Sequence, residues 1–365
     1  MLEGKIRHMF PGGNTSKGFF SYYNYILGQE EARHIFVIKG GPGVGKSTFM
    51  KRIGNEMVGR GYNTEFMHCS SDNNSLDGVV LPELKIAFLD GTAPHVVDPK
   101  NPGAVDEIIN FGECWDEAGM AKNRDAILPI NKEVGNLFAR AYRYLKAAAS
   151  VYEDTAVINS WIVDEGRLNL LGNELVGEIF GKIALSEKLG KQRCLFASAI
   201  TPDGYKNYLD TIINTKSVYV LGEIPGWHSD KMLERLKDAA VSRGYDVECY
   251  YCALFPDKLE HLVIPAMDLA FTSSNYYHHL KTETCKEIDI AAFVNKDAAN
   301  KYRSEISYNI SEFDALMSKT IETISKAKAL HDKMETYYVP NMDFEAVERC
   351  WEATMSRVLD YAKNV

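Results

Sequence analysis

The stretch HIFVIKGGPGVGKST, residues 34–48, joins an apolar run to a glycine-rich segment. The apolar run at 35–39 is typical of a buried strand, and residues 49–61 show helical spacing that ends at a glycine. The segment between them has every fixed position of the pattern G-x-x-x-x-G-K-[ST], in the strand-to-helix setting that this pattern requires. We therefore expect a phosphate-binding loop between a strand at 35–39 and a helix at 47–59.

Each residue type in this loop has a chemical reason. Glycine lets the backbone approach phosphate oxygens with its N–H groups pointing inward, and the start of a helix adds positive partial charge. Lys46 would place its ammonium on the β and γ phosphates, and Ser47 would offer a hydroxyl to Mg²⁺. The sequence has no Asn-Lys-x-Asp guanine reader, which favours ATP over GTP among the nucleoside triphosphates. The expected binding residues are Gly40, Gly41, Pro42, Gly43, Val44, Gly45, Lys46, Ser47 and Thr48.

A carboxylate is expected beside the loop. Residues 86–90 form an apolar run that ends in Asp90, and this run would be the third strand after those at 35–39 and 64–68. In a doubly wound sheet the carboxyl ends of the strands face the ligand crevice. Asp90 is therefore the expected Mg²⁺-side carboxylate and a catalytic candidate together with Lys46, and a turn-forming Asp-Gly pair is the alternative.

Two further aspartates lie in a polar segment, residues 68–78, that leaves the second strand on the same side. Asp72 and Asp77 are candidates for a catalytic base or a substrate contact. For each of them, capping of the turn that follows is the alternative.

The motif region occurs twice in the chain. Arg60-Gly61-Tyr62 recurs 183 residues later as Arg243-Gly244-Tyr245, and the same offset holds without a gap from residue 33 to residue 90. A repeat of this kind indicates a tandem duplication. Each copy ends in residues with helical spacing. We expect two α/β domains, 1–190 and 191–365, each with a phosphate-loop-type doubly wound parallel sheet followed by a helical hairpin or lid.

The second copy has lost the residues that would contact phosphate and metal. Glu223 and Asp230 would also place negative charge where a triphosphate sits, and like charges repel. We therefore expect one nucleotide site, with a degenerate second copy that is structural or regulatory. The replacements are Gly40 by Glu223, Gly45 by His228, Lys46 by Ser229, Ser47 by Asp230 and Asp90 by Ser273.

Composition limits the partners. The chain of 365 residues has a formal net charge of −9 and a pI near 5.6, which makes a bulk nucleic-acid binder unlikely. No apolar run approaches the roughly 18 residues of a membrane span, and the first residues lack the apolar stretch of a secretory signal. We expect a cytoplasmic location and no membrane partner. A small-molecule or protein partner and the oligomeric state stay open.

The sequence resembles the P-loop NTPase superfamily and, along nearly its whole length, an uncharacterised family of bacterial ATPases with tandem phosphate-loop domains. The first copy carries this resemblance in HMFPGGNTSKGF, GGPGVGKST, HCSSDNNSLDGV and FLDGTAPHVVDP, and the second in ITPDGY, RGYDVE and LVIPAMDLAFTSS. The resemblance implies an intact second loop, and this chain departs from that at residues 223, 228, 229 and 230.

Three functions follow as hypotheses. The first is Mg²⁺-dependent binding and hydrolysis of ATP, or of another nucleoside triphosphate, at a single site in the first copy. The second is a small-molecule or nucleotide kinase that uses the same loop, which the lack of an adjacent Asp-Glu pair after the third strand favours. The third is a non-enzymatic, nucleotide-gated binding module.

Overall fold

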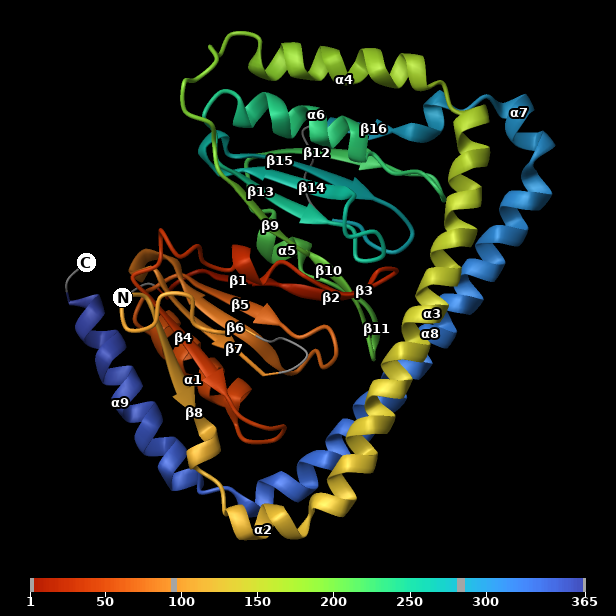
Figure 1. Ribbon diagram of the computed structural model, residues 1–365. Coiled ribbons are helices and arrows are strands. Elements are labelled where there is room, and N and C mark those ends of the chain that lie inside the picture. The colour runs from red at the N-terminus through yellow and green to blue at the C-terminus, as the bar shows by residue number, and fades with distance from the viewer. Residues whose placement is uncertain (1–2, 93–96, 281–285, 364–365) are drawn as a thin grey trace.

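The structure, a computed structural model, describes residues 3–92, 97–280 and 286–363. It is an α/β protein with one six-stranded sheet in each half of the chain (Figure 1). The first sheet has the order β1-β5-β6-β7-β4-β8. Its strands are β1 (Ile6–Met9), β4 (His34–Lys39), β5 (Thr64–His68), β6 (Leu76–Leu81), β7 (Ile86–Asp90) and β8 (Asp106–Asn110).

The second sheet repeats the first. Its order is β16-β12-β15-β14-β13-β9, so that β12 takes the place of β4 and β15 that of β7. Its strands are β9 (Gln192–Leu195), β12 (Ser217–Gly222), β13 (Val247–Tyr251), β14 (Leu259–Ile264), β15 (Leu269–Ser274) and β16 (Lys286–Asp289). The predicted strands at 35–39, 64–68 and 86–90 and the helix at 47–59 are confirmed as β4, β5, β7 and α1 (Lys46–Gly59).

Both sheets are mixed and mostly parallel, so the prediction of doubly wound parallel sheets is confirmed only in part. In the first sheet β6 runs antiparallel to both β5 and β7, whereas β4 is parallel to β7 and β8. The expected loop at 68–78 is correspondingly shorter, because β6 begins at Leu76. Asp77-Gly78 has the sequence of a turn. Gly78 nevertheless lies within the strand, where a Cβ would come within 2.9 Å of the carbonyl oxygen of Phe88.

The two sheets share a core. Val37, Val80 and Ala87 of the first sheet belong to one buried cluster with Val220 and Val263 of the second, so the inner faces of the sheets pack against each other. Between them lie two small hairpins and a short helix, and an isolated bridge from Phe10 to Phe196 links the halves. These elements are β2 (Gly12–Thr15) with β3 (Gly18–Ser21), β10 (Ser198–Thr201) with β11 (Gly204–Asn207), and α5 (Leu209–Ile212).

The outer face of each sheet is covered by a helix of its own half, and a helix from the other half of the chain packs against that helix. On the first sheet, α1 shares its core with Met355 and Val358 of α9 (Phe344–Ala362). On the second, α6 (Asp230–Val241) packs with Leu168 and Leu175 of α4 (Glu165–Phe180). Figure 1 shows α9 beside the first sheet and α4 beyond the second.

Two long helices connect these layers. α3 (Arg124–Ile162) and α8 (Arg303–Tyr338) lie side by side and run in opposite directions, and they follow the short helices α2 (Glu117–Lys122) and α7 (Lys296–Lys301) (Figure 1). The expected hairpin within each half is therefore replaced by a pairing between the halves. Apolar residues such as Leu145 and Met317 are buried in this pairing.

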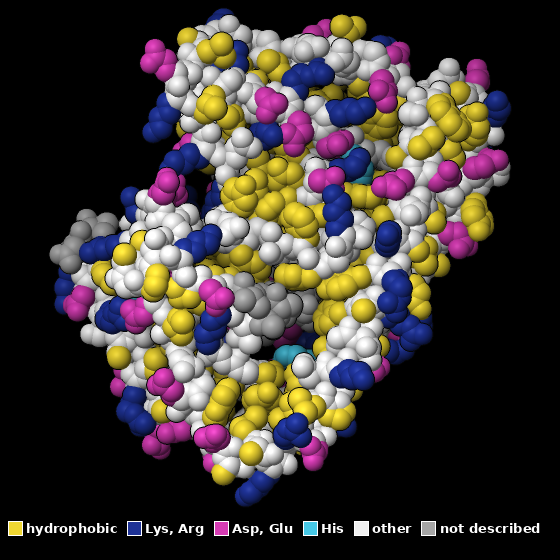
Figure 2. Space-filling model, in the orientation of Figure 1, with side chains coloured by type: hydrophobic (Ala, Val, Ile, Leu, Met, Phe, Trp, Pro, Cys, Tyr) yellow, Lys and Arg dark blue, Asp and Glu magenta, His cyan; other side chains and the backbone are white. Residues whose placement is uncertain are grey.

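The described surface has two further properties. On the face shown in Figure 2, basic and acidic side chains are interspersed and do not gather into one basic patch. None of the helices in the described parts of the chain combines the length and apolar character needed to cross a bilayer.

Candidate nucleotide site

The loop between β4 and α1 has the backbone shape that its glycines allow. Gly43 has φ +69° and Gly45 has φ +92°, both in the left-handed region that glycine adopts without strain. Gly45 is the N-cap residue of α1, so the helix begins at Lys46. The free N–H groups of the first helical turn therefore face the loop, which suits an anion.

The structure brings Lys46 and Asp90 together at the head of α1. Lys46 Nζ lies 3.6 Å from Asp90 Oδ2, and both side chains are largely buried. The ammonium also donates to the carbonyl oxygens of Gly40 at 2.9 Å and Gly41 at 2.7 Å. Asp90 reaches the loop because β7 pairs in parallel with β4, with Asp90 opposite Ile38.

Ser47 lies on the side of α1 that faces β6. Its Oγ accepts a hydrogen bond from the backbone N–H of Leu76 at 3.0 Å, one residue before Asp77. A hydroxyl oxygen has a second lone pair, so this bond leaves Ser47 able to contact a cation. Thr48 is exposed, and Val44 is buried in the core beneath the loop.

Thr92 is a loop contact that sequence reasoning missed. Its hydroxyl donates to the carbonyl of Gly40 at 2.8 Å, and its backbone N–H donates to Asp90 Oδ1 at 2.8 Å. Thr92 thus holds the first glycine of the loop and the carboxylate in one arrangement. The Asp-Gly-Thr order could have suggested this contact, because an aspartate often accepts from the N–H two residues later.

The two other predicted aspartates have different settings. Asp72 stays in the loop after β5, where it accepts from the N–H of Asn74 at 3.1 Å and from Ser75 Oγ at 2.8 Å. Asp77 lies on β6 with only 2% of its surface exposed, and the hydroxyl of Tyr23 donates to it at 2.7 Å. Asp72 therefore caps its own turn, whereas Asp77 is a buried carboxylate that follows Leu76, the residue whose N–H donates to Ser47.

Tyr23 connects the carboxylates electrostatically. Burial raises the pKa of its hydroxyl most, and the charge of Asp77 and, to a smaller degree, that of Asp90 add to the effect. The phenol therefore stays a hydrogen-bond donor across the physiological pH range. Nothing in its position between two strands, 54 residues before Asp77, marks it in the sequence.

The C-terminal end of α8 covers the loop. A Cβ on Gly41 would lie 2.4 Å from Tyr338 Cε1, and one on Gly43 would lie 3.0 Å from Glu335 Cβ. Further up the same helix, Lys328 Nζ lies 3.7 Å from Asp72 Oδ2. These contacts join residues more than 250 positions apart, so no local pattern in the sequence indicates them.

The corresponding loop of the second half is filled by its own side chain. Glu223, at the position of Gly40, accepts the backbone N–H of Ser229 at 2.7 Å and the amide of Asn275 at 3.2 Å. Ser229 stands at the position of Lys46, so the carboxyl group uses a donor that a phosphate would need. Burial, and then the charge of Glu260, raise the pKa of Glu223 to about 8.

This pKa corrects one expectation from the sequence. Near pH 7 Glu223 is mostly protonated, so its own charge adds little repulsion, while the expectation for Asp230 is unaffected. Glu223 also occupies a backbone donor of the loop. The end of α3 also covers this loop, because Asn159 donates to the carbonyl of Pro225 at 2.7 Å and a Cβ on Gly226 would lie 2.5 Å from Thr155 Cγ2.

No family model, no curated protein and no solved structure matches this chain. The likeness of the first loop to nucleotide-binding loops therefore rests on its own residues and geometry.

Proposed function

We propose that the first half of the chain binds Mg-ATP, or another nucleoside triphosphate, at the Gly40–Thr48 loop and hydrolyses it there. The observation that carries this proposal is the approach of Lys46 to Asp90 at 3.6 Å, at the start of a helix preceded by two left-handed glycines. A lysine and a carboxylate in this place can hold the phosphate chain and its metal ion. The second half takes no nucleotide in this proposal.

The described residues fit the cofactor. Lys46 Nζ is held by the carbonyls of Gly40 and Gly41, two neutral acceptors that phosphate oxygens can replace with a stronger charged contact. Ser47 and Asp90 would hold Mg²⁺, which prefers hydroxyl, carboxylate and phosphate oxygens. When bound, the ion stabilises the charge that develops on the transferred phosphoryl group.

The residues of the chain have separate tasks in this proposal. Asp77 is the candidate base, because it is buried and Tyr23 orients it. Asp72 connects the site to α8 through Lys328. Tyr338 covers Gly41, so the end of α8 helps to exclude water from the loop.

The long helix pair gives the site a connection to the second half. α8 ends on the first loop and α3 ends on the second, and the two helices are packed together along their length. A change at the first loop on nucleotide binding would move the end of α8 and bias its packing on α3. This connection supports a regulatory role for the second half.

The test compares Lys46→Ala with Ser229→Ala, the substitution at the same position of the second loop. We expect Mg-ATP to raise the thermal unfolding midpoint of the wild type and of Ser229→Ala, because a ligand stabilises the state that binds it. Lys46→Ala should lose this rise. An unchanged rise in Lys46→Ala, with Ser229→Ala as the folded control, would contradict the proposal.

Turnover distinguishes the three functions. Phosphate release from ATP alone supports hydrolysis, and it should disappear when Mg²⁺ is withheld. ADP formation that requires an added small molecule would indicate the kinase. Binding without turnover would indicate a nucleotide-gated module.

A further inference from the structure

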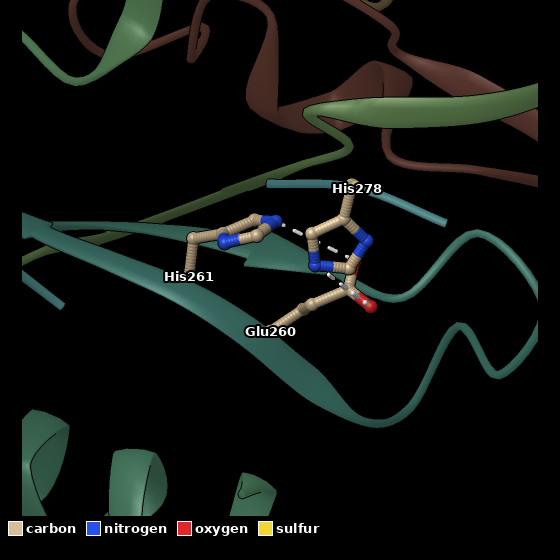
Figure 3. A group of neighbouring side chains, drawn as sticks. All are labelled: Glu260, His261 and His278. Carbon is tan, nitrogen blue, oxygen red and sulfur yellow. Dashed lines mark ion pairs between the residues drawn. The ribbon is translucent and has the colours of Figure 1, made fainter. Parts of the chain in front are cut away.

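A buried cluster of two histidines and a glutamate lies in the second half, where the first half has its candidate site. Glu260 occupies the position of Asp77, and His261 follows it on β14. His278 comes from the segment after β15. Figure 3 shows the two imidazole rings beside the carboxylate of Glu260. All three residues are at most 6% exposed, and their potential ligand atoms lie within 4.8 Å of one another.

A β-bulge explains how two successive residues of one strand can contribute to the same cluster. Tyr251 pairs with Leu259 and Tyr250 with His261, so Glu260 is an extra residue in β14. Side chains normally alternate between the faces of a sheet, and a bulge changes their direction locally. The first half has the same irregularity, because His68 pairs with Leu76 and Met67 with Gly78, leaving Asp77 as the extra residue.

The hydrogen bonds around His261 allow its Nδ1 to carry the proton. Its Nδ1 lies 2.8 Å from Thr272 Oγ1, and that hydroxyl donates its single hydrogen to the carbonyl of Ser273 at 3.2 Å. Nδ1 is then the donor to Thr272, and Nε2 carries a lone pair. This arrangement, with the second nitrogen held by a neighbouring acceptor, is the one that metal-binding histidines commonly have.

The lone pair of His261 has no suitable protein partner. Among the described residues Nε2 has no hydrogen-bond partner, although this side chain is completely buried. Glu260 Oε2 lies 3.5 Å away and is itself an acceptor when ionised. With the proton on Nδ1, Nε2 and the carboxylate are two acceptors that face each other in a buried site, and a cation between them would satisfy both.

His278 completes the set. Its Nε2 lies 3.8 Å from Glu260 Oε1 and 3.1 Å from Ser273 Oγ, whose hydroxyl is free to rotate its hydrogen. Zinc bonds of about 2.0–2.2 Å at tetrahedral angles place ligand atoms about 3.3–3.5 Å apart. The observed separations are 3.5 Å to Oε2 and 3.8 Å to Oε1 of Glu260, and one ligand atom from each of the three residues lies within 4.8 Å of the others, so binding would draw the side chains closer together.

The cluster also has space for a further ligand. A cavity of about 60 Å³ is lined by Glu260, His278, His228 and Asn275 among others, which is room for a water molecule. Two histidines and one carboxylate with an open fourth position are a known donor set for Zn²⁺.

We infer that Glu260, His261 and His278 bind one divalent transition-metal ion of the Zn²⁺ type, with water as the fourth ligand. The ion would join β14 to the segment after β15. It would lie where the first half has Asp77 and Asp90, so each half would hold a different cation in the corresponding crevice. This inference does not depend on nucleotide binding at Lys46.

The test uses the full-length chain after removal of metal by a chelator, titrated with Zn²⁺ by calorimetry and with Co²⁺ by visible absorption. We expect one equivalent to bind, with the strong absorption of four-coordinate Co²⁺, and a higher thermal unfolding midpoint with metal. His278→Gln and Glu260→Gln should each weaken binding by more than the roughly 10- to 100-fold that loss of an outer partner costs. Thr272→Val, which removes the acceptor of His261 Nδ1, should fall within that range.

His279→Gln is the matched control, because His279 is the exposed neighbour of His278. It should bind Zn²⁺ as the wild type does, and so should Lys46→Ala. Absence of saturable binding by the wild type would overturn the inference, as would unchanged affinity in both His278→Gln and Glu260→Gln. If these variants do not fold, zinc-edge X-ray absorption of the wild type decides, and a spectrum without imidazole ligands rejects the site.

Discussion

Arg7 in the first half donates to Glu248 in the second, with Nη1 at 2.8 Å from Oε1 and a further contact between Nη2 and Oε2. The repeat supplies a counterpart to this ion pair. Arg193, which corresponds to Arg7, donates through Nη1 at 2.9 Å to Glu65, which corresponds to Glu248. The two pairs cross between the sheets, so each half provides the cation for a carboxylate of the other.

Arg7→Met should destabilise the protein strongly. It leaves the carboxylate of Glu248, 14% exposed, without its main partner. Loss of one member of a buried pair costs about 3–5 kcal/mol, and we expect the lower end because Arg7 is 26% exposed. Urea unfolding measures this decrease in the free energy of unfolding, and Arg193→Met should decrease it by a similar amount. Arg349→Met, at an exposed pair with Asp343, is the control and should change stability by about 0.5 kcal/mol or less. Equal effects of Arg7→Met and Arg349→Met would refute the prediction.

The same pair should make stability depend on acid. Burial alone would raise the pKa of Glu248, but the hydrogen bond and charge of Arg7, together with the charge of Arg193, hold it below the ordinary value of 4.5. The stabilisation is therefore fully present above pH 4.5 and is lost as the pH falls through the lower, folded-state pKa. We expect the free energy of unfolding to decrease less between about pH 5 and pH 3 in Glu248→Gln than in the wild type. If the free energy of unfolding falls equally with pH in the wild type and in Glu248→Gln, the ion pair does not contribute to the acid dependence between about pH 5 and pH 3.

Ser229→Lys should not create a second nucleotide site. The new ammonium would meet a loop whose Ser229 N–H is already bound by Glu223. Calorimetry with Mg-ATP should still find one site per chain, as in the wild type. A stoichiometry of two in the variant would show that the lysine alone is decisive.

Gly41→Ala should separate the end of α8 from the loop. The added Cβ would overlap Tyr338 Cε1, and overpacking of this kind costs about 1–3 kcal/mol. In a Tyr338→Ala background the same change should cost little, giving an interaction energy of about 0.5–3 kcal/mol in a double-mutant cycle by urea unfolding. Gly59→Ala, at the end of α1 with open space around it, is the control. If the changes in the free energy of unfolding caused by Gly41→Ala and Tyr338→Ala are additive, the two residues have no interaction energy.

The sequence predicted the elements that depend on local patterns. The β4-loop-α1 unit follows from an apolar run, glycines and helical spacing, and the repeat located its counterpart β12-α6. Asp90 was placed beside the loop correctly because it ends a strand that pairs with β4. Asp77 was assigned to a loop because it lies in the polar segment 68–78, and a bulged strand has no sequence pattern of its own.

Contacts between distant segments could not be predicted. α3 and α8 both show helical spacing, but an apolar face does not say which partner covers it. The position of Tyr338 over Gly41 therefore emerges only from the fold. The sequence around His278 likewise gives no sign of the cluster, because Glu260 and His261 lie on another segment of the chain.

The crossing of α4 and α9 to opposite sheets has a consequence for the origin of the molecule. One copy on its own would keep α1 or α6 on its sheet, but the side of that helix that packs against the other copy's helix would be exposed, and its own last helix would have no packing partner. Such a copy would be complete only when two of them traded these helices as separate chains. Gene fusion would then have joined the two copies in one chain, after which one of the two loops could diverge in sequence.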